Sequence, residues 1–208
     1  MPRLHAELAT TVNSHLAAVP PAQIRAFDEE ISAVPGLVKL TLGEPDFAVP
    51  DHVKKAAIES IQNDDSHYSP SKGKIELRKA ISKYLEQSRH VYYDPETEIV
   101  VTIGATEAVT ATTFAMLNPG DKVIIPTPAF SLYFPSVSLT GAEPIKVNTA
   151  DEGFLLSAER LEEVLAKEGP AVKAVLLNYP NNPTGRSYTE EELKALAKVI
   201  KDHHIYAI

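Results

Sequence analysis

One stretch, Asn-Tyr-Pro-Asn-Asn-Pro-Thr-Gly at positions 178–185, constrains the fold more than any other part of the sequence. It follows an apolar run at residues 174–177 that is typical of a buried parallel strand. It precedes Thr189 and the glutamates at 190–192, which predict an N-cap and the acidic first turn of a helix. The stretch is therefore predicted to be a loop at the carboxyl end of a strand, where open α/β sheets bind ligands.

The composition of this loop combines a stiff backbone with polar side chains. Two prolines restrict the main chain, and the asparagine side chains both donate and accept hydrogen bonds. Gly185 permits a positive φ, and a cis peptide between Asn182 and Pro183 could aim the Asn182 side chain at a fixed point. For this stretch taken alone, the alternative is an ordinary turn rich in Asn, Pro and Gly.

The composition of the whole chain excludes several classes of function. The 208 residues are 44% hydrophobic and 23% charged, which is enough for a sizeable globular core. The net charge of −8 and the absence of a basic stripe argue against a nucleic-acid partner. Cysteine is absent, and the histidines show no metal-ligand spacing, so we expect no disulfide and no metal site. No membrane-length apolar run or signal peptide is present, so we expect a cytoplasmic protein without a membrane partner.

Hydrophobic periodicity predicts an α/β chain behind a loose N-terminal arm at residues 1–20. The helices are predicted at residues 21–32, 51–63, 75–88, 104–117, 157–167 and 190–202. The strands are predicted at residues 37–42, 98–103, 122–126, 144–147, 174–177 and 205–208. Asp51 is predicted as an N-cap. Apolar residues are expected to face the core at Ile24, Phe27, Ile31, Ile75, Leu77, Ile81 and Leu85.

Residues 104–106 have the layout of an anion site. A strand, Gly104, a small residue, Thr106 and then a helix leave free amides at a helix N-terminus, where the dipole favours phosphate. The pattern is neither GxGxxG nor a P-loop, so neither a dinucleotide nor a nucleoside triphosphate is indicated.

Three other residues each have two interpretations. Phe130, just past the strand at 122–126, could stack on a flat ring or pack in the core. Tyr68 could bind a phosphate through its hydroxyl or be an exposed loop tyrosine. Gly43 could bring a main-chain amide close to a ligand or be a plain turn glycine.

Five motifs occur in a recognisable order: GEPDF at 43–47, YSPxxGxxxLR at 68–78, TIGATEA at 102–108, PxPxFxxY at 126–133 and NNPTG at 181–185. The chain from about Ile24 to Ile208 closely resembles the pyridoxal-phosphate aminotransferases of class I/II, the fold type I aspartate aminotransferase superfamily. Within it, the chain is most similar to the bacterial aromatic amino-acid aminotransferases. The resemblance implies a three-layer α/β/α large domain with a mostly parallel sheet, its first half at 47–208. Residues 1–46 would be the N-terminal arm and part of the small domain.

The resemblance also assigns roles to the candidate residues. Gly104, Ala105 and Thr106 would bind the phosphate of pyridoxal 5'-phosphate, and Phe130 would stack on its pyridine ring. Asn182 would bind the ring 3-oxygen and help hold the substrate carboxylate. Gly43 would present its amide to that carboxylate. Tyr68 would reach the phosphate of the neighbouring subunit, which implies a homodimer acting on an amino acid and a 2-oxo acid.

The family places no catalytic residue within these 208 residues. Its Schiff-base lysine, with an aspartate and an arginine, follows later in the chain, beyond the position of Ile208. We therefore expect an aminotransferase for the parent sequence but no amino transfer by this chain alone. The strand at 98–103 would also lack its sheet neighbours, so we expect a distorted or oligomeric sheet.

Three alternatives stay open. A carbon–sulfur lyase of the same fold would share these N-terminal motifs. A non-catalytic remnant could bind the cofactor or a full-length subunit. An aminotransferase-like domain of a transcription regulator ranks low, because no helix-turn-helix segment precedes the motifs.

Overall fold

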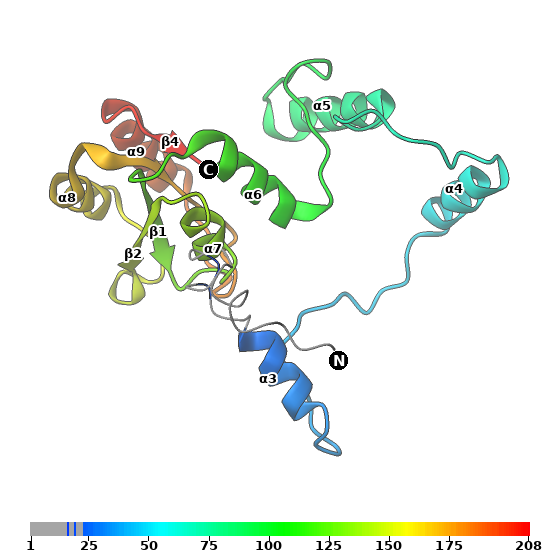
Figure 1. Cartoon of the computed structure of the whole chain (residues 1–208), viewed down its shortest axis with the longest axis horizontal. Helices are drawn as coiled ribbons and strands as arrows, with labels where there is room; N and C mark the ends of the chain where they lie inside the picture. Colours follow the sequence, from blue (N-terminus) through cyan, green and yellow to red (C-terminus); the bar gives the residue numbers. More distant parts are fainter. Residues whose placement is uncertain (1–15, 17–18, 20–22) are drawn as a thin grey trace, which may run out of the picture. The chain divides into compact units, whose positions relative to one another are not determined.

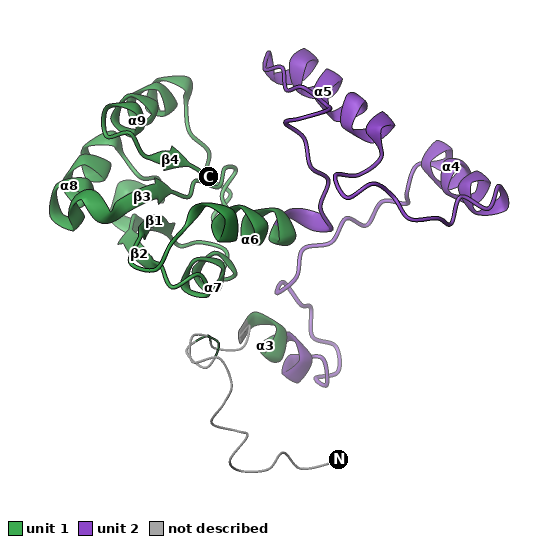
Figure 2. Ribbon diagram, turned by 45° about the horizontal axis from the view of Figure 1, so that its top comes forward, with its two compact units in different colours: residues 1–27, 106–208 green, residues 28–105 purple. Residues whose placement is uncertain are grey.

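The computed structural model describes residues 16, 19 and 23–208. The chain divides into two compact units, unit 1 with residues 1–27 and 106–208 and unit 2 with residues 28–105 (Figure 2). The predicted arm at 1–20 lies outside the described residues except for positions 16 and 19. The predicted domains at 1–46 and 47–208 stay a prediction.

Unit 1 is built on a four-stranded sheet. Its strands are β1(Lys122–Thr127), β2(Glu143–Asn148), β3(Val172–Val175) and β4(Tyr206–Ala207). Their order is β2-β1-β3-β4, and every pair is parallel. Because the crossovers between parallel strands need long connections, helices and loops separate all four strands in sequence. The carboxyl ends of the strands therefore meet at one edge of the sheet.

Helices cover both faces of this sheet (Figure 1). On one face, Ile124 and Val175 pack with Leu161 of α8(Ala158–Glu168) and Leu196 of α9(Glu190–Asp202). On the other face, Val123 and Ile125 pack with Val137 of α7(Tyr133–Ser138) and with α6(Gly104–Met116). Successive residues of β1 thus serve opposite clusters, as the period of a strand requires. The unit is a three-layer α/β/α structure, so the predicted fold class is confirmed.

The short connecting elements of unit 1 follow from local sequence. The 3-10 helices are η1(Ala150–Glu152) and η2(Gly169–Ala171). Ser157 caps α8 by accepting from the Arg160 amide, and Thr189 caps α9 with a complete capping box. The start predicted for α9 from Thr189 and its acidic first turn is confirmed.

Unit 2 holds α4(Asp51–Gln62) and α5(Ile75–Arg89). Helix α3(Gln23–Ile31) begins in unit 1 and ends in unit 2. Unit 2 buries little apolar surface, and α4 has no buried residue. Within the described part of the whole chain, no helix has the length and apolarity needed to cross a bilayer.

Two predicted strands, at residues 37–42 and 98–103, are wrong because neither joins the sheet. Val38 and Leu40 are 82% and 92% exposed, so no neighbour covers the first segment. In the second segment, the Val101 amide donates to the Lys72 carbonyl oxygen, a loop contact rather than a ladder. An extended segment becomes a strand only when another strand satisfies its main chain.

Smaller expectations also fail in this part of the chain. Pro50, not Asp51, occupies the N-cap of α4, and Asp51 is the first helical residue. Ile24, Phe27 and Leu77 are exposed. The buried residues of α5 are instead polar, Arg78 and Ser82, because both bond to main-chain oxygens of the segment that follows the helix.

Candidate functional site

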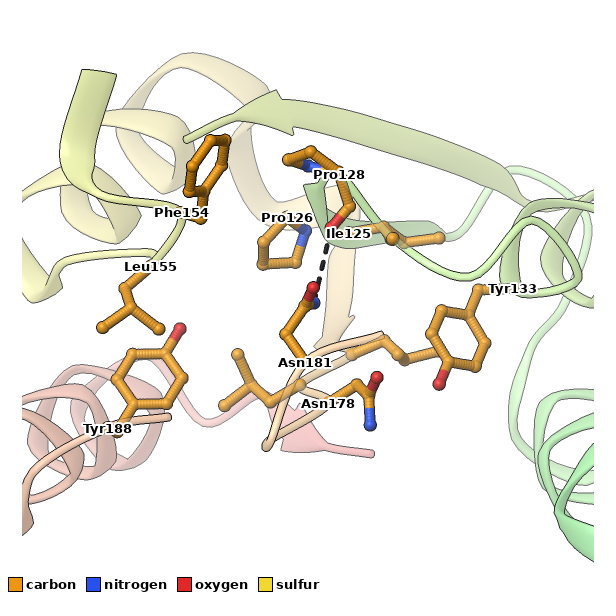
Figure 3. Close-up of a pocket in the computed structure, with 12 residues that line it drawn as sticks. Ile125, Pro126, Pro128, Tyr133, Phe154, Leu155, Asn178, Asn181 and Tyr188 are labelled. Atoms are coloured by element: carbon orange, nitrogen blue, oxygen red, sulfur yellow. Dashed lines mark hydrogen bonds between the residues drawn. The ribbon is translucent and has the colours of Figure 1, made fainter. Parts of the chain in front are cut away.

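The candidate site lies where β1 and β3 end. These strands are adjacent and parallel, so the loops that follow Thr127 and Val175 lie together at the carboxyl edge of the sheet. The loops also touch, because the side-chain amide of Asn181 donates to the carbonyl oxygen of Pro128 over 3.4 Å (Figure 3). The predicted position of the 178–185 loop is therefore confirmed.

A small hollow separates these loops from the 149–157 segment. Figure 3 shows Phe154 and Leu155 on one side of it, Tyr133 on another and Asn181 between them. The hollow has a volume of about 10 Å³, which is room for one water and not for an organic cofactor. A ligand of this edge must therefore bind on the outer surface of the loops.

Asn181 is used by the loop itself. Its side-chain oxygen accepts from the amide of Thr184 over 3.1 Å and from the Thr184 hydroxyl over 2.9 Å. Its main-chain amide donates to the Arg186 carbonyl oxygen, and its own carbonyl oxygen accepts from the Gly185 amide, both over 2.7 Å. Gly185 has a φ of +70°, so the positive φ predicted there is confirmed. Asn181 is thus a brace of the loop, and both acceptor positions of its side-chain oxygen are used.

Asn182 is in the opposite situation. It is exposed, and among the described residues its side chain makes no hydrogen bond. Its main-chain amide donates to the Asn178 side-chain oxygen over 2.8 Å, and the peptide bond to Pro183 is cis. The carboxamide of Asn182 is thus a free donor and acceptor at the carboxyl edge of the sheet, as a ligand-binding group there must be.

Two contacts brace this loop from the far side. Arg186 donates through Nε to the Gly153 carbonyl oxygen over 3.0 Å. The Tyr188 hydroxyl accepts from the Leu156 amide over 3.0 Å, and burial raises the pKa of Tyr188. No local sequence pattern predicts either contact, since the partners of Arg186 and Tyr188 lie 33 and 32 positions away.

The predicted stacking role of Phe130 stays a prediction, and the residue belongs to neither core cluster of the described chain. It is half-buried, and its ring meets Tyr133 edge-on at 5.6 Å between centroids. The Tyr133 amide donates to the Phe130 carbonyl oxygen, which ties Phe130 to the start of α7. Burial raises the pKa of Tyr133. Phe130 is thus a partly exposed aromatic residue just past the end of β1, at the same edge of the sheet as the loop of Asn182.

Helix α6 begins at Gly104, where the predicted anion site lies. Gly104, Ala105 and Thr106 are all exposed, and Gly104 has a φ of +83°. A Cβ at Gly104 would meet no atom within 4 Å, so the backbone conformation, not crowding, requires glycine. The Thr106 hydroxyl has no partner among the described residues. The Gly104 amide donates to the Thr102 carbonyl oxygen over 2.9 Å, so the predicted anion site rests on the Ala105 and Thr106 amides and the Thr106 hydroxyl.

Gly43 and Tyr68 belong to unit 2, and their predicted roles stay predictions. Tyr68 is fully exposed, with a relative accessibility of 106%. Gly43 has no positive φ and would tolerate a Cβ without any neighbour within 4 Å. Nothing within unit 2 therefore demands glycine at position 43.

A parallel sheet covered by helices on both faces, with an exposed asparagine loop at its carboxyl edge, places the chain in the doubly covered α/β class, whose ligands bind at that edge. The family model for aminotransferases of class I and II matches residues 35–208. The chain belongs to this family, so the resemblance inferred from the five motifs is confirmed.

The relatives carry aminotransferase names with different substrates. The "Probable N-acetyl-LL-diaminopimelate aminotransferase" of Bacillus subtilis is 40% identical over 89% of this chain and 46% of its own length. The aromatic-amino-acid aminotransferase 2 of Thermococcus litoralis is 33% identical over 93% of this chain and 49% of its own. The chain thus spans about half the length of the curated relatives it matches.

Solved structures agree with the fold. The aspartate aminotransferase of Thermotoga maritima superposes with a TM-score of 0.86 at 32% identity, over 94% of this chain and 52% of that one. The aromatic aminotransferase of Pyrococcus horikoshii superposes with a TM-score of 0.78 at 35% identity, over 86% of this chain and 48% of that one. None of the relatives named here is a carbon–sulfur lyase, so that alternative is not favoured.

Proposed function

We propose that this chain is the cofactor-binding part of a pyridoxal-phosphate aminotransferase. One observation carries the proposal: the Asn182 carboxamide is exposed and unbonded within a loop whose other asparagines are used as braces. A free amide held on a stiff loop is suited to bind a fixed polar atom of a ligand. Membership of the aminotransferase family supplies the class of ligand.

The residues present fit this cofactor. The first turn of α6 suits the phosphate, because Ala105 and Thr106 are exposed at the helix N-terminus and the Thr106 hydroxyl is unbonded within the described residues. Phe130 is partly exposed and would stack on the flat pyridine ring. Asn182 would donate to the ring 3-oxygen and hold the substrate carboxylate. When bound, pyridoxal phosphate supplies the electron sink for amino transfer.

The chain itself would bind without completing the transfer. None of the chain's lysines sits in a motif that matches the family's Schiff-base lysine. The covalent step needs an amine at the cofactor. We therefore expect purified chain, free of host enzymes, to show no amino transfer from phenylalanine or aspartate to a 2-oxo acid. A measurable rate would contradict this part of the proposal.

Substrate, subunit contact and location are narrower proposals. We propose an aromatic amino acid as the donor, a 2-oxo acid as the acceptor, and a homodimer in the cytoplasm in which Tyr68 reaches the neighbouring phosphate. The printed names of relatives include both aromatic and aspartate aminotransferases. Chain loaded with cofactor should bind 3-phenylpropionate more tightly than succinate, and the reverse order would exclude the aromatic preference. Sedimentation equilibrium tests the dimer.

Titration of the chain with pyridoxal phosphate, followed by the cofactor's absorbance, tests the core of the proposal. Thr106→Val and Phe130→Ala should each raise Kd about fivefold to tenfold, because each removes one contact worth about 1 kcal/mol. The matched controls are Thr112→Val and Phe114→Ala on α6, away from its first turn. If the wild-type chain does not bind, or if all four variants bind equally, the proposed function is wrong.

A further inference from the structure

We infer that Asn178 is a positioning residue for Asn182. Its side-chain oxygen fixes the main chain of Asn182 and so sets the direction of the Asn182 carboxamide. This inference rests on the proposed function, in which that carboxamide binds the cofactor and the substrate carboxylate.

The contact itself is direct. The Asn182 amide donates to Asn178 Oδ1 over 2.8 Å, a distance at the strong end of the normal range for such bonds. Asn178 is half-buried, whereas Asn182 is exposed. The bond therefore joins an exposed residue to a partly enclosed one across the base of the loop.

Asn178 follows directly on residues that are hydrogen-bonded to the neighbouring strands. The amide of Leu176 donates to the Ile124 carbonyl oxygen over 2.9 Å, and that of Leu177 donates to the Ile208 carbonyl oxygen over 2.8 Å. These bonds extend the sheet contacts of β3 up to the residue before Asn178. The Asn178 side chain thus links the sheet to Asn182, a loop residue four positions further on.

Asn182 has few other restraints. Its side chain has no partner among the described residues. The next residue, Pro183, has no amide to donate. The bonds of Asn181 close the outer part of the loop, at Thr184, Gly185 and Arg186. The Asn182 amide is consequently the one main-chain donor that can fix this residue, and Asn178 is its acceptor.

Hydrogen exchange by NMR, on the chain without cofactor, tests the first half of the inference. Asn178→Leu keeps the side-chain size but removes the acceptor, so the Asn182 amide should exchange about fivefold faster. Asn178→Asp keeps an acceptor oxygen and should restore slow exchange. Asn148→Leu is the matched control, because Asn148 Oδ1 accepts from the Ala150 amide over 3.0 Å in another loop. If Asn178→Leu does not fold, Asn178→Gln serves instead, since it moves the acceptor by one carbon.

Titration with pyridoxal phosphate tests the second half. Asn178→Leu should raise Kd about fivefold, and Asn148→Leu should leave Kd unchanged. Unchanged exchange at Asn182 overturns the inference, and so does faster exchange with an unchanged Kd. If the wild-type chain fails to bind the cofactor, the proposed function is wrong, and the exchange result alone decides whether Asn178 fixes Asn182.

Discussion

The buried hydroxyl of Thr113 donates to the main-chain carbonyl oxygen of Ser136 over 2.9 Å and so joins α6 to α7. Thr113→Val should lower the free energy of unfolding by about 1–2 kcal/mol, because the Ser136 oxygen would be left buried without this partner. Urea unfolding at pH 7 measures the change. Thr112→Val is the control, as Thr112 is half-buried on the same helix and makes no side-chain hydrogen bond among the described residues.

Truncation of Asn181 to alanine should lower the stability of the fold, whereas truncation of Asn182 should weaken cofactor binding. Asn181→Ala removes the bonds to Thr184 and should destabilise the fold by about 1–2 kcal/mol. Asn182→Ala removes no internal side-chain bond, so it should leave unfolding unchanged and raise Kd for pyridoxal phosphate about tenfold. Urea unfolding and cofactor titration of both variants separate the two roles. Equal effects on unfolding would contradict the division.

The N-cap of α9 should contribute measurably to the free energy of unfolding. Thr189 Oγ1 accepts from the Glu192 amide over 3.3 Å, and Glu192 Oε2 accepts from the Thr189 amide over 2.7 Å. Thr189→Ala should lower the free energy of unfolding by about 1 kcal/mol, because a first-turn amide loses its acceptor. Ser187→Ala, two positions earlier and without a hydrogen bond in the described structure, should change it by less than about 0.5 kcal/mol. The same urea assay compares the two variants.

Asp121 should make the free energy of unfolding depend on pH. The amide of Asn118 and the ammonium group of Lys173 hold the pKa of its carboxyl below the ordinary value. The folded pKa is then lower than the unfolded one. Ionised Asp121 stabilises the fold above the unfolded pKa, and this contribution disappears as the pH falls through the lower, folded value.

The difference in unfolding free energy between wild type and Asp121→Asn should therefore be largest near pH 7 and narrow below about pH 4. Urea unfolding at a series of pH values measures it. Asp151→Asn, at an exposed carboxyl, is the control. If the difference in unfolding free energy between wild type and Asp121→Asn does not change with pH, Asp121 stabilises the fold through packing and hydrogen bonds rather than through its charge.

Arg78 should hold unit 2 together. It is 6% exposed, and its guanidinium donates to the carbonyl oxygens of Gly73 over 3.1 Å, Glu96 over 3.4 Å and Pro95. Arg78→Lys cannot reproduce this fork, so exchange of amides in residues 67–98 should speed up by the equivalent of about 1.5–3 kcal/mol. Exchange read by mass spectrometry checks it, with the exposed Arg89→Lys as control. Unchanged amide exchange in Arg78→Lys would mean that residues 67–98 are stabilised without the Arg78 hydrogen bonds.

Local signals predicted the elements of unit 1 because each is specified by its own residues. Thr189 and the glutamates after it mark the start of α9, and the apolar run of β1 marks a buried strand. The segments at 37–42 and 98–103 have strand composition, but pairing depends on a partner elsewhere in the chain. Burial of Arg78 depends likewise on carbonyl groups from a segment 17 and 18 positions away.

The site likewise has features that local sequence predicts and features that depend on distant partners. Its place in the chain followed from a strand, a stiff loop and a helix start. The division of labour among three asparagines did not, since Asn178, Asn181 and Asn182 have identical side chains and differ only in what the fold places beside them. The contacts of Arg186 and Tyr188 could not be predicted either, because their partners lie in another segment of the chain.

The packing of Tyr188 gives the loops an optical label of their own. The chain has eight tyrosines and no tryptophan, so no indole signal overlaps the near-ultraviolet absorption and emission of its tyrosines. Tyr133 and Tyr188 flank the hollow (Figure 3), and Tyr188 also meets Tyr179 edge-on at 5.5 Å. Because burial raises the pKa of Tyr133 and Tyr188, these two phenols ionise late in an alkaline titration. The tyrosinate absorbance at alkaline pH is therefore a probe of the surroundings of Tyr133 and Tyr188 that needs no added dye.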